Sequence, residues 1–89
     1  MEKVKENTIH LSIIKDFGNR EVVFKRKLLD MIVFDYNPSF ITFYLSNGEE
    51  ISGVYDGEKE FSHLLADIEF CETVHILLDD TIIENRRGL

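Results

Sequence analysis

Short runs in which apolar and polar residues alternate are the feature that most constrains how this chain folds. In residues 8–14, the alternate positions Ile9, Leu11 and Ile13 are apolar. Successive side chains of a β-strand point to opposite faces of the sheet, so this period of two predicts a strand with one buried face. The same reasoning predicts further strands at residues 21–28, 30–36, 40–45 and 51–55.

Three details of these runs carry more specific expectations. Strand 30–36 is apolar on both faces, so we expect it to be central in the sheet. Arg26 falls on the apolar side of strand 21–28, which places it near a sheet edge, where its guanidinium group reaches water. Asn47-Gly48 predicts a tight hairpin with a type I′ turn, because that turn needs positive φ at both positions.

After the hairpin, the period changes from two to the spacing of an α-helix. Apolar residues recur at i, i+3, i+4 and i+7 and form one helical stripe, namely Phe61, Leu64, Leu65 and Ile68. Asp56 is the expected N-cap. We expect Glu58 and Glu60 in the first turn, where the helix dipole favours negative charge.

These elements together predict the fold class. A strand at 73–78 follows the helix, then a turn at Asp79-Asp80 and a short last strand at 81–83. The prediction is therefore an α+β fold, in which an antiparallel β-meander of about five strands carries one amphipathic helix packed on one face, followed by one or two further short strands. A length of 89 residues allows a single domain spanning 1–89, and we expect residues 1–6 and 85–89 to be loose termini.

Charge is distributed unevenly along the chain. Residues 1–28 hold seven Lys or Arg and four Asp or Glu, a net +3. Residues 29–89 hold three and thirteen, a net −10, which gives −7 for the whole chain. Such a field repels phosphate backbones and attracts basic partners, so a basic protein is the expected partner and nucleic acid is disfavoured.

The expected compartment is the cytoplasm. Cys71 is the only cysteine, so no internal disulfide forms, which is typical of proteins in reducing compartments. No apolar h-region follows Met1, and no apolar run is long enough to span a membrane, so we expect no membrane association.

No residue pattern indicates a catalytic, metal or cofactor site, so we expect no enzyme. His10, His63 and His75 lack the spacing of metal ligands, and His63 is expected on the exposed side of the helix. His10 and His75 lie on the polar faces of two strands and meet only if those strands pair. A reactive thiolate needs positive surroundings, but Cys71 precedes Glu72, so we expect a small packed side chain.

The order of strands, Asn-Gly hairpin, helix and Thr-Val-His-Ile strand resembles the LytTR DNA-binding domain of bacterial regulators. In that family a helix ending in an aromatic residue precedes a histidine-bearing strand, and Phe70 and His75 stand at the corresponding positions, with the spacing between them different by one residue. The resemblance covers about two-thirds of the chain and implies DNA binding. It departs from the family at Ile76 and Leu77, where the family has basic residues, and in lacking the family's C-terminal strands.

The preferred hypothesis is a small acidic, non-enzymatic binding or regulatory domain, of the inhibitor or immunity type, that masks a basic surface of a partner protein. The expected partner-binding residues are acids predicted to be exposed, namely Glu49, Glu50, Asp56, Glu58, Glu60, Asp67, Glu69, Asp79 and Asp80. One alternative is a LytTR-like DNA-binding regulator. The other is a self-associating structural or assembly component that forms a homodimer through an unpaired sheet edge.

Overall fold

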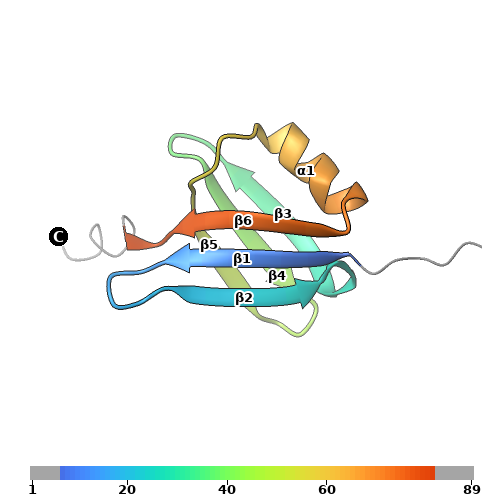
Figure 1. Ribbon diagram of the computed structural model, residues 1–89, viewed down its shortest axis with the longest axis horizontal. Coiled ribbons are helices and arrows are strands. Elements are labelled where there is room, and N and C mark those ends of the chain that lie inside the picture. The colour runs from blue at the N-terminus through green and yellow to red at the C-terminus, as the bar shows by residue number, and fades with distance from the viewer. Residues whose placement is uncertain (1–6, 82–89) are drawn as a thin grey trace, which may run out of the picture.

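The computed structural model describes residues 7–81 and has one six-stranded sheet with one helix (Figure 1). The strands run in the spatial order β2-β1-β6-β5-β4-β3. The elements in chain order are β1 (Thr8–Ile14), β2 (Arg20–Lys25), the 3₁₀ turn η1 (Arg26–Leu28), β3 (Leu29–Asp35), β4 (Phe40–Leu45), β5 (Glu50–Tyr55), α1 (Phe61–Phe70) and β6 (Thr73–Asp79). The α+β class, the mainly antiparallel sheet and the single packed helix are confirmed.

The strand order differs from a simple meander. β6, the last strand within residues 7–81, lies between β1 and β5, parallel to β1 and antiparallel to β5. η1 redirects the chain after β2, so β2 and β3 follow one another in sequence but form opposite edges of the sheet. The expectation that strand 30–36 is central was therefore wrong, since β3 is an edge strand. Its second apolar face, which includes Met31, remains partly exposed to solvent.

The sheet bends sharply between β5 and β6, which pair only through Val54 with Asp79 and Tyr55 with Leu78. As a result, β1, β2 and β6 cross in front of β3, β4 and β5 (Figure 1). The inward faces of these two layers form one core with Leu64 and Ile68 of α1, and Phe61 packs against it. Leu65, the remaining residue of the predicted helical stripe, is 41% exposed. The buried side chains of the core are Ile9, Leu11, Ile13, Phe24, Leu29, Ile41, Phe43, Leu45, Ile51, Leu64, Ile68, Val74, Ile76 and Leu78.

Two local expectations need correction. The β4–β5 hairpin turns at Asn47-Gly48, but only Gly48 has positive φ, so the turn is not type I′. Instead, Asn47 Oδ1 accepts a hydrogen bond from the backbone N–H of Glu49. The N-cap of α1 is Glu60 rather than Asp56, because the chain stays extended until residue 60, and no acid lies in the first helical turn.

Arg26 lies just beyond the edge strand β2, in η1, so its expected place near a sheet edge is confirmed. The expected loose termini, residues 1–6 and 85–89, lie outside the described residues. Of the expected last strand at 81–83, only residue 81 is described. Within residues 7–81, the helix is too short to cross a membrane.

Candidate functional site

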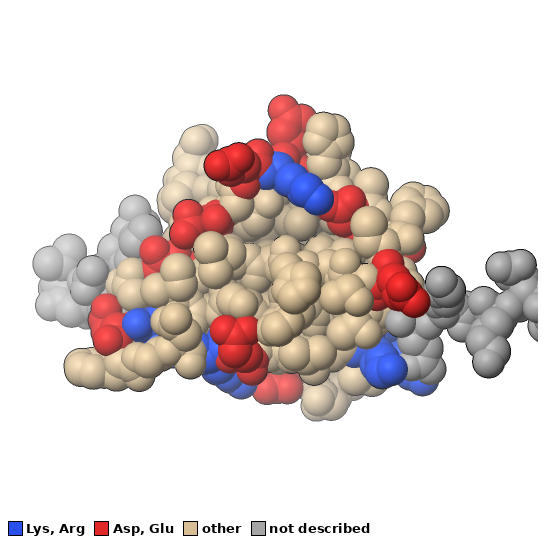
Figure 2. Space-filling model, in the orientation of Figure 1, with Lys and Arg blue, Asp and Glu red and all other residues tan. Residues whose placement is uncertain are grey.

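The loop between β5 and α1, residues 56–60, is here named the acidic loop. It exposes Asp56, Glu58 and Glu60, and none of the three forms an ion pair within residues 7–81. The backbone N–H of Asp56 donates to the carbonyl of Leu77 at 2.9 Å, which fixes the start of the loop against β6. In Figure 2, acidic side chains gather over the loop and helix at the top of the view, above an uncharged band over β6 and β1.

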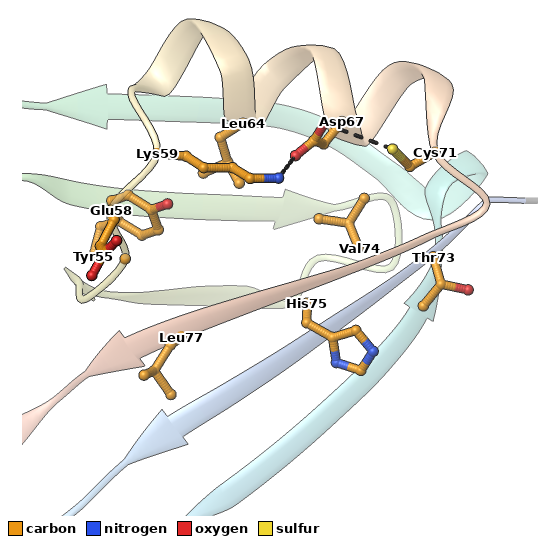
Figure 3. A pocket seen from close by; sticks show the side chains of 11 residues that line it. Tyr55, Glu58, Lys59, Leu64, Asp67, Cys71, Thr73, Val74, His75 and Leu77 are labelled. Atoms are coloured by element: carbon orange, nitrogen blue, oxygen red, sulfur yellow. Dashed lines mark hydrogen bonds and ion pairs between the residues drawn. The ribbon is translucent and has the colours of Figure 1, made fainter.

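A groove of about 510 Å³ lies between α1 and β6 on one side of the acidic loop (Figure 3). Leu64 from the helix and Val74 from β6 are both buried and form its apolar floor. Lys59 extends along the helix to an ion pair with Asp67. Cys71 Sγ lies 3.6 Å from the other oxygen of the same carboxylate.

The Lys59–Asp67 pair fixes two opposite charges at the edge of this groove. The hydrogen bond from Lys59 lowers the pKa of Asp67, and the hydrogen bond to Asp67 raises the pKa of Lys59. Both side chains therefore stay charged over a wider pH range than isolated groups. Because they neutralise each other, the net charge around the groove comes from the acidic loop.

Cys71 is exposed at the end of the helix, so the expectation that it is packed was wrong. The reason is that α1 ends at Phe70 and the chain leaves the helix at Cys71, beyond the part of α1 that faces the core. Figure 3 shows the thiol directed at Asp67 and the imidazole of His75 directed away from it. An acidic neighbour and an imidazole directed away from the thiol are not the surroundings that activate a nucleophilic thiol.

A second hollow, of about 490 Å³, lies on the other side of the acidic loop. Tyr36, Tyr55 and Phe61 contribute aromatic rings to it, and Glu60 contributes a carboxylate. The two hollows share Tyr55, Gly57 and Lys59, so the acidic loop separates two adjacent recesses. Sequence reasoning missed this ring group because Tyr36, just after β3, is distant in sequence from Tyr55 at the end of β5 and Phe61 at the start of α1.

The expected partner-binding acids fall into two groups. One group consists of the three acids of the acidic loop together with Asp67 and Glu69 on the helix. Of these, Asp67 pairs with Lys59, and Glu69 Oε2 accepts a hydrogen bond from Arg26 at 2.6 Å. The other group lies at the β4–β5 turn and the end of β6, and it consists of Glu49, Glu50, Asp79 and Asp80.

That second group is here named the paired-acid region, because three of its four carboxylates have a bonded partner: two have a cation and the third has Thr81. Asp80 pairs with Lys15 at 2.8 Å, and Glu49 lies 3.6 Å from Arg20. Asp79 Oδ1 accepts hydrogen bonds from the backbone and hydroxyl of Thr81. Ion pairs therefore balance four of the nine predicted acids, namely Glu49, Asp67, Glu69 and Asp80. Asp56, Glu58 and Glu60 of the acidic loop have no such pair within residues 7–81.

The histidines His10 and His75 do meet, because β1 and β6 pair in a register that places them opposite each other. Their ring centroids lie 4.8 Å apart on the exposed face of the sheet, and His63 is exposed on the helix as expected. His10 Nε2 lies 2.7 Å from Glu21 Oε1, which also accepts a hydrogen bond from Ser12. The bonds from Ser12 and His10 lower the pKa of Glu21.

This histidine cluster does not form a recognisable catalytic or metal centre. Ser12 donates to the carboxylate of Glu21 rather than to an imidazole, so Ser12 and the two histidines do not form a Ser–His pair. Among the residues that the structure describes, no three His, Cys, Asp or Glu side chains are grouped to hold a metal ion. The acidic loop with its two hollows is therefore the strongest candidate for a functional site.

Comparison with known proteins adds no assignment to this geometry. No protein-family model, no curated protein and no solved structure matches the chain. Its function must therefore be argued from its own side chains.

Proposed function

We propose that this chain is a small non-enzymatic binding domain that covers a basic surface of a partner protein through the acidic loop. The observation that carries the proposal is the position of three exposed carboxylates, Asp56, Glu58 and Glu60, on a ridge between two hollows. Carboxylates in such a position attract a basic partner and select its orientation.

The second hollow supplies what charge alone does not. Rim charges mainly raise the association rate and the specificity, while buried apolar and aromatic contacts hold a complex together. Tyr55 and Phe61 in the second hollow are only partly buried and offer such contacts beside the acidic loop. A basic segment that carries apolar or planar side chains complements this surface.

The test compares charge reversal at two places with the same change in net charge. The variant Asp56→Lys/Glu58→Lys alters the acidic loop, and the control Glu49→Lys/Glu50→Lys alters the paired-acid region. Wild type and both variants serve as bait in a lysate, and each captured protein is then purified and titrated by calorimetry. We expect the loop variant to lose at least about tenfold in affinity, as expected when close charge pairs are reversed, and the control to keep it.

Salt supplies a second readout on the same purified complex. Raising ionic strength from about 0.05 M to 0.5 M shortens the screening length several-fold, so affinity should fall for wild type and change less for the loop variant. Equal affinity for wild type and the loop variant would count against the proposal. A mobility shift of duplex DNA by the wild-type chain would favour the LytTR-like alternative instead.

A further inference from the structure

Phe61, the first residue of α1, lies at the centre of a group of aromatic rings. Its ring centroid is 5.2 Å from that of Tyr36 and 5.7 Å from that of Tyr55, with interplanar angles of 51° and 45°. Phe34 packs against it at 4.5 Å. The rings of Tyr36, Tyr55 and Phe61 with the carboxylate of Glu60 are here named the aromatic hollow.

Neighbouring residues position two of these rings. A Cβ atom at Gly57 would overlap the ring of Tyr55, so the absence of a side chain there lets the ring lie against the acidic loop. Phe34 supports Phe61 and does not line the hollow itself. Tyr36, in contrast, is 69% exposed, so its ring is accessible to a ligand.

The chemistry of this hollow favours a cation. The face of an aromatic ring carries partial negative charge, so an exposed ring face attracts a cation that lies against it. Glu60 adds a formal negative charge, and Asp56 and Glu58 lie on the same loop. Lys59 also lines the hollow, but its ammonium group is paired with Asp67, so its charge is balanced locally.

We propose that the aromatic hollow binds the guanidinium group of an arginine side chain presented by the partner. This inference rests on the proposed function and names the anchor residue on the partner's side. A guanidinium group is planar, so it stacks on a tyrosine or phenylalanine face while its N–H groups donate to a carboxylate such as Glu60. A lysine ammonium group fits a stacked arrangement less well.

The direct test uses small peptides that differ in charge but hardly in shape. The isotope-labelled full chain is titrated by NMR with acetyl-Gly-Arg-Gly-amide, and then with the same peptide carrying citrulline, the neutral isostere of arginine. We expect the arginine peptide to shift resonances of Tyr36, Tyr55 and Phe61, and the citrulline peptide to bind about fivefold more weakly, within the usual range of cation–π attraction. A lysine peptide should bind more weakly than arginine.

Variants locate the binding. Tyr36→Ala and Glu60→Gln should each weaken arginine binding about three- to tenfold, and both change exposed side chains, so folding is spared. The matched control is Phe17→Ala, since Phe17 is a fully exposed aromatic residue in the turn between β1 and β2. Arginine and citrulline peptides of equal affinity, shifts that map elsewhere, or no shifts at all would overturn the inference, and equal affinity for lysine would overturn the choice of arginine.

Failure of arginine binding and failure of the proposed masking role would give different results. If the arginine peptide does not bind but Asp56→Lys/Glu58→Lys still removes the partner, the acidic loop acts without an aromatic anchor. If the peptide binds and the loop reversal leaves partner affinity unchanged, the hollow recognises arginine but the proposed masking role is wrong.

Discussion

The acidic loop and the paired-acid region contain the same kinds of residue, yet they differ in what surrounds each carboxylate. In the paired-acid region, Lys15 and Arg20 from the β1–β2 hairpin lie beside Asp80 and Glu49. The carboxylates of the acidic loop have no ion-pair partner within residues 7–81. The comparison teaches that the net charge of −7 does not show where the negative potential is strong. Ion pairs weaken the potential at the paired-acid region, whereas the unpaired carboxylates of the acidic loop extend their field into solvent.

The two regions also differ in how they are held. The paired-acid region lies at the ends of paired strands. The acidic loop is fixed at one end by β5 and at the other by α1, which meets the core through Leu64 and Ile68. The acidic loop should therefore open more easily than the paired-acid region, since a short helix is anchored by few buried side chains.

Leu64→Ala should produce the largest effect, and it tests whether the two regions differ in local stability. Leu64 is 2% exposed, so its truncation leaves a cavity and lowers the free energy of unfolding by about 3 kcal/mol. Denaturant unfolding measures the loss, and amide exchange should accelerate in α1 and the acidic loop more than at the β4–β5 turn. Leu65→Ala, on the exposed side of the same helix, should cost less than about 1 kcal/mol. Equal acceleration in both regions would show that they do not differ in local stability.

Lys15→Met should have an intermediate effect and make the paired-acid region resemble the acidic loop. Removing the ammonium group leaves the partly buried carboxylate of Asp80 without its cation, which should cost about 1 kcal/mol of unfolding free energy. Adding Asp80→Asn should recover part of the loss, because no unpaired charge then remains. The control is Arg20→Met, whose ion pair is longer and more exposed, and it should change stability by less than about 0.5 kcal/mol. No recovery in the double variant would mean that Lys15 acts by packing.

Titration of Asp67 should give the smallest effect, and it tests the ion pair between this residue and Lys59 of the acidic loop. The folded-state pKa of Asp67 lies below its ordinary value of 3.8, chiefly through the hydrogen bond from Lys59. Its contribution to stability is therefore present above about pH 4 and is lost as the pH falls through the folded-state pKa. NMR titration of the carboxyl carbon measures this pKa, and Lys59→Met should return it toward 3.8. An unchanged pKa in that variant would contradict the assigned cause.

The local elements of the fold were predictable from sequence because their signals are local. The alternation of Ile9, Leu11 and Ile13 and the helical spacing of Leu64 and Ile68 both locate elements that the structure contains. Strand order was not predictable, since periodicity shows which face of a strand is buried and does not identify its neighbours. Insertion of β6 between β1 and β5 depends on packing of α1 and on the bend at the β5–β6 junction.

The site was less predictable than the fold. Composition identified an excess of acids, but nothing in the sequence shows that Lys15 lies beside Asp80, 65 residues away. The rings of Tyr36, Tyr55 and Phe61 give no shared motif either. The one weak signal is Gly57 in the acidic loop, a small residue where a neighbouring ring needs space.

The central position of β6 has a consequence for how the chain reaches its native state. The hairpin of β1 and β2 and the three strands β3–β5 become parts of one sheet only when Thr73–Asp79 is available to join them. A polypeptide interrupted before residue 73 would present two incomplete sheets, each with a hydrogen-bonding edge that β6 normally fills. Such intermediates are prone to pair with other chains, so completion of the centre protects the molecule against aggregation during synthesis.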